Sequence, residues 1–225
     1  MQPVHPNTQK AQVRALLAVD QVVTTAQLER WGLLRAAEQL ELPITELTCR
    51  TRVTQSDSVI DLTFVALERE HLDLAPRELM HLCGLAEARR GRVLAAGERW
   101  QHVSLKGRAK GNHPDAEIIR PADLERRSDW AVEFDAGYAP ARIAQKLEAA
   151  AAAGYTRILW ATSIHDRTRT VTALAARLYR QGRLPGIESI ETRYVNFWTP
   201  NDPYTNRPRC HKQMVAYLDF RAAAG

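Results

Sequence analysis

Acidic side chains recur at alternate positions in two short segments of the second half of the chain. In the segment HPDAEI these are Asp115 and Glu117, and in the segment WAVEFD they are Glu133 and Asp135. Because the side chains of a strand point alternately to its two faces, each pair shares a face if both segments are strands. Neighbouring strands would then bring up to four carboxylates together, where like charges repel and raise one another's pKa. The pattern therefore predicts a compensating cation.

The compensating cation is expected to be either a divalent metal or a basic side chain. Carboxylate oxygens suit Mg²⁺ or Mn²⁺, and these metals assist phosphodiester hydrolysis. No cofactor is certain from the sequence. Mg²⁺ is expected only if the acids are catalytic. The plainer alternative is that these acids lie on a sheet edge, where they are solvated or paired with arginine.

Motifs for several other chemistries are missing from the sequence. The seven histidines and three cysteines show no Cys-x-x-Cys or His-x-x-x-His spacing, which argues against structural zinc. There is neither a phosphate-binding loop of the Walker type nor a Gly-x-Gly-x-x-Gly segment, so nucleotide and dinucleotide cofactors are not expected. The Gly-x-Ser-x-Gly motif of serine hydrolases is missing as well.

Positive charge is concentrated in the second half of the chain. Residues 1–100 contain 12 Lys and Arg against 13 Asp and Glu, whereas residues 101–225 contain 19 against 13. Such an asymmetry indicates an anionic partner for the basic half, and nucleic acid is the commonest one. The basic loop KGRAKGN supplies three candidate DNA contacts, Lys106, Arg108 and Lys110. A solvated, arginine-rich surface without a partner is the alternative.

Length and composition are those of a globular protein. The 225 residues are 45% hydrophobic and 25% charged, which argues against wholesale disorder. Three widely spaced cysteines do not form the framework of a disulfide-rich secreted domain. No stretch approaches the roughly 18 apolar residues of a membrane span, and the N-terminus lacks the apolar region of a signal peptide. We therefore expect a cytoplasmic protein with no membrane partner.

Residues 35–53 (RAAEQLELPITELTCRTRV) are expected to form a helix-turn-helix motif. A first helix would be broken at Pro43, and Thr45 would cap a second helix. Two helices separated by a tight turn are typical of one large class of DNA-binding proteins. We therefore predict that Thr45, Arg50 and Arg52 contact DNA from the second helix.

Two alternatives are open for this region. In the first, the short helix Ala26–Trp31, capped by Thr24 or Thr25, is the first helix of the motif and shifts its register. In the second, the segment is an ordinary helical hairpin. Residues 54–65 are predicted to be a turn and a short strand, which would serve as the wing of a winged helix.

The rest of the chain is predicted to alternate between helices and strands. The expected helices are 8–19, 76–96, 140–153 and 168–181, and the expected strands are 100–105, 113–119, 130–135, 157–162, one within 187–198, and 214–220. Alternation of this kind predicts an α/β (α+β) fold whose second sheet is partly parallel. The break at Ala75-Pro76 divides it into domains 1–75 and 76–225.

The acidic segments resemble the core of the PD-(D/E)xK nucleases. Pro114-Asp115 matches the first part of that motif and Glu133-x-Asp135 the second, with Asp135 at the position of the family's lysine. In this family the Asp and the Glu bind Mg²⁺, and the Lys orients the attacking water. The resemblance implies that Asp115 and Glu133 are metal ligands. Some members carry the Lys on the next helix, where this chain has Lys146.

The chain as a whole is similar to the replication-relaxation family of plasmids and other bacterial mobile elements. The resemblance covers roughly residues 10–180 and is carried by the N-terminal region, by LMHLCGLAEARRGRVLAAG and by DWAVEFDAGY. It implies a winged helix-turn-helix followed by a nuclease-like domain, and DNA binding in maintenance of the element. Three functions follow as hypotheses: a DNA-binding protein with a degenerate nuclease-like domain, a Mg²⁺-dependent endonuclease, or a transcription regulator that forms a homodimer.

Overall fold

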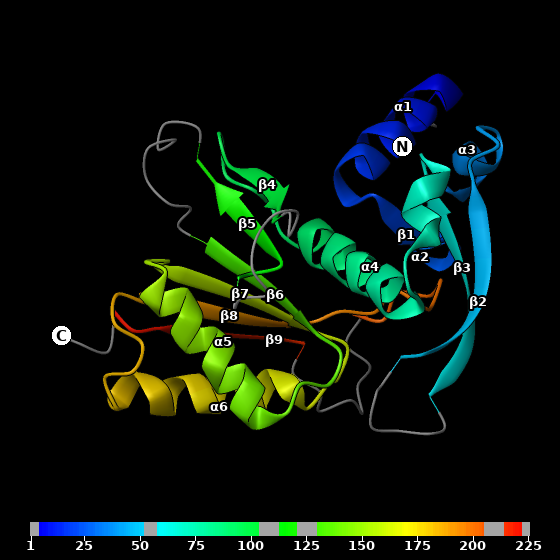
Figure 1. Cartoon of the computed structure of the whole chain (residues 1–225). Helices are drawn as coiled ribbons and strands as arrows, with labels where there is room; N and C mark the ends of the chain where they lie inside the picture. Colours follow the sequence, from blue (N-terminus) through cyan, green and yellow to red (C-terminus); the bar gives the residue numbers. More distant parts are fainter. Residues whose placement is uncertain (1–4, 52–57, 104–112, 121–129, 205–213, 222–225) are drawn as a thin grey trace. The chain divides into compact units, whose positions relative to one another are not determined.

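The computed structural model describes residues 5–51, 58–103, 113–120, 130–204 and 214–221 (Figure 1). The chain forms two compact units. The first unit comprises Met1–Glu87 and Asn196–Pro208, and the second unit comprises Ala88–Val195 and Arg209–Gly225. Each unit has its own sheet with helices, so the predicted mixed α/β class is confirmed. In the part of the chain that is described, no helix is both long and apolar enough to cross a membrane.

The first unit is built on a three-stranded antiparallel sheet with helices. In chain order its elements are α1 (Pro6–Asp20), β1 (Val22–Thr24), α2 (Thr25–Arg30), α3 (Leu34–Glu38), β2 (Ile44–Arg50), β3 (Val59–Ala66), the 3-10 helix η1 (Arg69–Asp73) and most of α4 (Pro76–Arg90). The strand order is β1-β3-β2. Apolar residues of α1, α2, α3 and β3 form its core, among them Val13, Leu17, Leu28, Ala36 and Val65.

Local sequence signals explain how α2 begins and ends. The hydroxyl of Thr24 accepts a hydrogen bond from the N–H of Gln27, whose side chain accepts one from the N–H of Thr24, a reciprocal capping box. After α2, Gly32 has a φ of +69°, a left-handed conformation that costs glycine little. This glycine lies in the three-residue turn between α2 and α3. The predicted short helix Ala26–Trp31 is thus present.

The predicted second helix of the 35–53 motif is wrong, because Ile44–Arg50 is strand β2. β-branched residues and side chains that alternate between more and less exposed positions suit a strand. Its pairing with β3, from Ile44 opposite Val65 to Arg50 opposite Val59, provides the backbone partners. Thr45 lies half-buried on this strand and Arg50 is exposed at its end, while Arg52 lies outside the described residues.

The boundary between the two units falls in α4, after Glu87, whereas the sequence predicted one at residue 75. The side chain of Gln27 donates to the carbonyl oxygen of Cys83 at 3.0 Å, and Ala86 belongs to the core of the first unit. Through these contacts α4 belongs to the first unit as far as Glu87. The helix ends at Arg90 rather than at the predicted residue 96.

The second unit contains a six-stranded mixed sheet. Its elements are β4 (Arg99–His102), β5 (Ala116–Ile119), β6 (Trp130–Asp135), α5 (Pro140–Ala152), β7 (Arg157–Thr162), α6 (Arg167–Arg180), β8 (Ser189–Tyr194) and β9 (Val215–Asp219), and the strand order follows the chain. β6, β7 and β8 are mutually parallel, and the other neighbouring pairs are antiparallel. The partly parallel sheet was predicted, and β6 and β7 have the predicted bounds.

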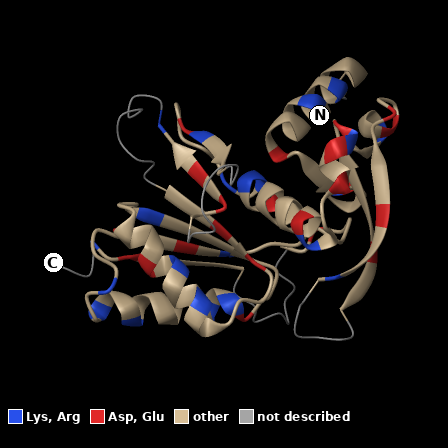
Figure 2. Cartoon of the chain, in the orientation of Figure 1, with Lys and Arg blue, Asp and Glu red and all other residues tan. Residues whose placement is uncertain are grey.

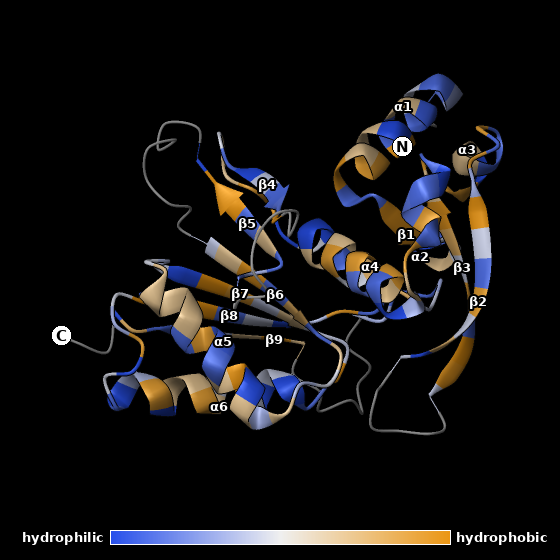
Figure 3. Cartoon of the chain, viewed as in Figure 1, coloured by the Kyte–Doolittle hydropathy of each residue, from blue (hydrophilic) through white to orange (hydrophobic). Residues whose placement is uncertain are grey.

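Helices α5 and α6 share one hydrophobic core with the sheet of the second unit. Figure 3 shows hydrophilic and hydrophobic residues alternating along α6, as expected of an amphipathic helix. The apolar side chains of the two helices pack against Ala131, Ile158, Trp160 and Ile190. Side-chain alternation along β6 puts Glu133 on the same face as Ala131. This acid is therefore held beneath the helices and is only 2% exposed.

Candidate functional site

The pairing of β5 with β6 brings Asp115 beside Glu133. Ala116 lies opposite Val132, and the N–H of Asp115, one residue before β5, donates to the carbonyl oxygen of Val132 at 2.9 Å. The Asp115 carboxylate in turn accepts a hydrogen bond from the N–H of Phe134 through Oδ2 at 2.8 Å. The backbone of β6 thus holds this side chain next to the following acid.

Lys146 completes a cluster with these two acids. Its Nζ lies 2.5 Å from Glu133 Oε2 and 3.6 Å from Asp115 Oδ1, and it donates to the carbonyl oxygen of His113 at 3.3 Å. The lysine is 5% exposed and reaches the acids from α5, which starts with Pro140 in its first turn. We call Asp115, Glu133 and Lys146 the acid–lysine cluster. Of the four predicted catalytic residues, Asp115, Glu133, Asp135 and Lys146, the structure thus brings together all but Asp135.

The acid–lysine cluster combines two carboxyl groups with a single ammonium group in a largely buried position. Desolvation raises the pKa of the Glu133 carboxyl well above its ordinary value, and the neighbouring charge of Asp115 raises it further. The ammonium of Lys146 and its hydrogen bond act in the opposite direction but do not reverse the shift. One ammonium facing two carboxylates leaves a buried site that additional positive charge would stabilise.

The two other predicted acids have different partners, so the expected meeting of four carboxylates does not form. Asp135 is fully buried, and its Oδ1 accepts hydrogen bonds from the N–H groups of Gly137, at 2.6 Å, and Tyr138. Its Oδ2 lies 3.8 Å from Nη1 of Arg167 on α6. The carboxylate of Glu117 accepts a hydrogen bond from the hydroxyl of Tyr155. Asp135 therefore stabilises the turn between β6 and α5 and does not extend the cluster.

The cluster fits Mg²⁺ better than a metal held entirely by protein. Within the described ranges, no group of three or more His, Cys, Asp or Glu side chains could hold a metal ion. Mg²⁺ commonly uses one or two carboxylates, keeps several waters and takes further oxygens from substrate phosphates. The carboxylates of Asp115 and Glu133 already face one cation, the ammonium of Lys146, from two neighbouring strands. They are the two residues that would hold such an ion.

Most of the predicted DNA contacts are not part of a described surface. Thr45 and Arg50 lie on a strand instead of a recognition helix. Lys106, Arg108 and Lys110, like Arg52, fall outside the described residues. Arg35, which is exposed on α3, is not among the residues predicted to contact DNA. The glycine at position 32 was the signal that could have found it, since glycine often marks the turn of a helix-turn-helix.

The two units differ in sign of charge. By sequence, the first unit contains 9 Lys and Arg against 13 Asp and Glu, and the second contains 22 against 13. Figure 2 shows basic residues on α5 and along α6. The net charge is therefore −4 for the first unit and +9 for the second. A polyanion would therefore be attracted mainly by the unit that contains the acid–lysine cluster.

No family model, curated protein or solved structure matches this chain. Its function has to be argued from the chemistry of its own residues.

Proposed function

We propose that this chain is a DNA-binding protein of the replication-relaxation type, with a winged helix-turn-helix in its first unit and a nuclease-like domain in its second. The observation that carries the proposal is the convergence of Asp115, Glu133 and Lys146 on one face of a mixed sheet. This is the set of residues that the resemblance to PD-(D/E)xK nucleases implies, with the lysine supplied by a helix.

The first unit supports the DNA-binding part of the proposal. Its helices α2 and α3 are joined by the turn that contains Gly32, and its β2–β3 hairpin follows directly. We assign α2 and α3 as the helix-turn-helix and the hairpin as the wing. Arg35 is exposed on α3 and Arg50 at the end of the wing strand β2. Arginine is the residue that most often reads guanine in the major groove.

The second unit supports a role with phosphates. Its positive net charge attracts a nucleic acid backbone, and counterions released on binding would make the affinity dependent on salt. A phosphodiester would supply the oxygens that Asp115 and Glu133 alone do not provide to Mg²⁺. When bound, the metal polarises a phosphoryl oxygen and lowers the pKa of a bound water. Lys146 would then donate hydrogen bonds to the oxygens at this site.

An electrophoretic-shift titration on duplex and single-stranded DNA, with and without Mg²⁺, tests the proposal. We expect duplex binding that weakens steeply between about 50 and 200 mM salt, because phosphate contacts release counterions. Mg²⁺ is expected to tighten duplex binding by the wild type and to leave binding by Glu133→Gln unchanged. A protein that shifts neither form of DNA, or whose affinity is flat with salt, would contradict the proposal.

A second candidate function is Mg²⁺-dependent cleavage of DNA. The observation that favours it is the contact of Lys146 with Glu133, since this lysine takes the place of the one that Asp135 replaces. Nicking of supercoiled plasmid in the presence of Mg²⁺, lost in Glu133→Ala and in Lys146→Ala, would support it. If the plasmid stays intact after long incubation with a protein that still binds DNA, cleavage is excluded and DNA binding is the only function that stands.

A further inference from the structure

The outer face of α6 carries three exposed arginines. Arg169, Arg177 and Arg180 are exposed, whereas Val171 and Leu178 of the same helix are buried in the core. At 3.6 residues per turn, the three arginines lie within an arc of roughly 80° on the side opposite to the buried stripe. We call these three residues the arginine face.

The sequence of α6 supplies no acid of its own beside these arginines. From Arg167 to Ile187 the sequence contains five arginines and neither Asp nor Glu. Surface helices ordinarily intersperse both signs of charge, and like charges three or four residues apart destabilise a helix. Arg177 and Arg180 are such a pair. A bound anion would remove their repulsion.

The dimensions of the arginine face suit a nucleic acid backbone. Arg169 and Arg180 are 11 residues apart, which is about 16 Å along a helix. A DNA duplex presents one negative charge per about 1.7 Å of its axis, so several phosphates fall within that length. The planar guanidinium group binds phosphate oxygens with two parallel hydrogen bonds.

A protein partner would need different residues. Protein interfaces have an apolar or aromatic centre, whereas the exposed residues between these arginines are Thr170 and Ala173. The hydrophobic side chains of α6 are instead turned inward, into the core of the second unit. The face therefore offers charge without an apolar anchor.

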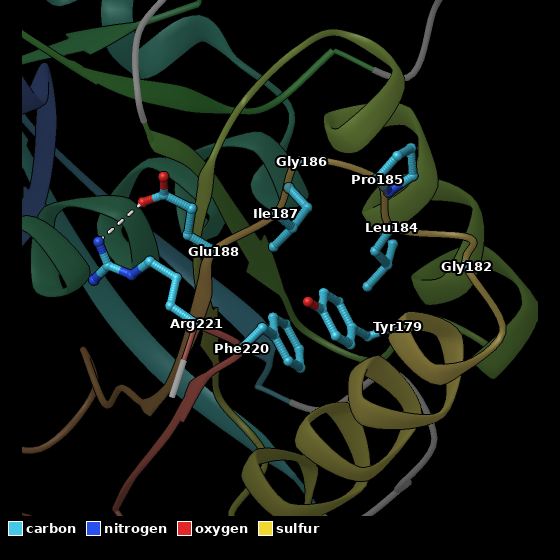
Figure 4. A pocket seen from close by; sticks show the side chains of 9 residues that line it. All are labelled: Tyr179, Gly182, Leu184, Pro185, Gly186, Ile187, Glu188, Phe220 and Arg221. Atoms are coloured by element: carbon cyan, nitrogen blue, oxygen red, sulfur yellow. Dashed lines mark ion pairs between the residues drawn. The ribbon is translucent and has the colours of Figure 1, made fainter. Parts of the chain in front are cut away.

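A hollow at the end of α6 provides a contrast. It has a volume of about 660 Å³, and the rings of Tyr179 and Phe220 stack within it at 3.9 Å (Figure 4). The charged residues at its rim neutralise each other, because Arg221 lies 3.4 Å from Glu188. Arg183, next to the hollow, pairs with Glu148. These two arginines are exposed but already compensated.

We infer that the arginine face of α6 is a contact surface for the phosphate backbone of duplex DNA. This inference rests on the proposed DNA binding and adds to it a surface distinct from the acid–lysine cluster. The contacts are independent of base sequence, since phosphates carry no sequence information. They would use part of the positive charge that the second unit carries and the first does not.

Two double variants with equal loss of charge test the inference. Arg177→Ala/Arg180→Ala removes two arginines of the face, and Arg183→Ala/Arg221→Ala removes two that are paired with acids. Affinity for a 25-base-pair duplex is measured by fluorescence anisotropy from about 50 to 200 mM salt. We expect the slope of log Kd against log salt to fall by about 2 in the first variant and to stay within about 0.5 of wild type in the second.

Further measurements separate the possible failures. Arg177→Lys/Arg180→Lys should retain the wild-type slope because it retains the charge, and melting curves should coincide for all three variants. If the wild type does not bind DNA, the proposed function itself fails. If it binds and both alanine variants have the wild-type slope, or equal reduced slopes, the inference is overturned and the proposed function stands. If only the first variant changes its oligomeric mass and its DNA affinity is unchanged, the inference is overturned. The arginine face would then bind a second copy of this chain instead of DNA.

Discussion

Two buried carboxylates, one in each unit, have very different surroundings. In the first unit, Glu87 receives a hydrogen bond at 2.7 Å from Arg30, one at 2.9 Å from Gln27 and one at 2.7 Å from the hydroxyl of Tyr204. In the second unit, Glu133 has one ammonium beside it and a second carboxylate close by. Both acids are almost fully buried, at 3% and 2% exposure.

The donors around a buried carboxylate distinguish a structural charge from a functional one. A buried acid whose oxygens are all occupied by donors of its own chain has no capacity for a ligand, and its removal damages the fold. A buried acid with a raised pKa and a like-charged neighbour is destabilised until a cation or a proton arrives. We assign Glu87 to the first kind and Glu133 to the second.

Replacing Glu87 with alanine should produce the largest loss of stability. The change leaves Arg30 as a buried charge without its partner and removes the acceptor of Gln27 and Tyr204. Breaking a buried pair on one side costs about 3–5 kcal/mol of unfolding free energy. Urea denaturation of Glu87→Ala and Glu133→Gln measures the contrast. A loss smaller in Glu87→Ala than in Glu133→Gln would reverse the assignment.

Replacing Arg35 with alanine should weaken sequence-specific binding of duplex DNA. A side chain that reads a base contributes about 1–3 kcal/mol to the specific complex. Arg14, exposed on α1 in the same unit, is the control because it carries equal charge outside the proposed motif. Competition between a specific and a random duplex measures the difference. Equal behaviour of Arg35→Ala and Arg14→Ala would exclude α3 as the recognition helix.

The stability of the metal-free protein should fall as the pH rises above the ordinary pKa of glutamate. The folded-state pKa of Glu133 is raised, so the folded protein retains a proton that the unfolded chain releases. Its stabilising contribution is complete below about 4.3, the ordinary value, and is lost as the pH rises through the raised pKa. One proton gives a slope of at most about 1.4 kcal/mol per pH unit.

The control for this pH dependence is Glu133→Gln, which cannot take up the proton. Urea denaturation in the presence of a chelator, at a series of pH values, is expected to give a shallower decline for this variant. The charges of Asp115 and Lys146 remain in both proteins, so the difference between the two curves isolates Glu133. Parallel curves would show that Glu133 keeps an ordinary pKa in the folded protein.

Much of the second unit could be predicted because its signals are local. Alternation within Trp130–Asp135 identified a strand and put Glu133 and Asp135 on one face. Pro140 marked the start of the helix that carries Lys146. The approach of Lys146 to the acids followed from packing that helix over the sheet. The structural role of Asp135 could not be predicted, because its partners are backbone N–H groups of a turn and an arginine on a distant helix.

The first unit was harder to predict because long-range pairing overrides its local pattern. Thr45 before a run of Glu, Leu and Thr resembles a helix cap, yet seven pairs of residues between β2 and β3 make the segment a strand. The five-residue helix α3 is too short to show a full period of apolar residues. Its identity comes from the turn at Gly32 and from burial of Ala36 and Ala37 against the rest of the unit.

The measurement that tests the central claim most directly is the melting temperature of the protein titrated with Mn²⁺. A ligand that binds only the folded state stabilises it by about 2.7 kcal/mol at a concentration one hundred times its Kd. We predict a rise in the wild type that disappears in Asp115→Ala/Glu133→Ala. Glu117→Gln should retain it, because this acid lies outside the acid–lysine cluster. A wild type that Mn²⁺ does not stabilise, or a rise that persists without Asp115 and Glu133, would contradict the account.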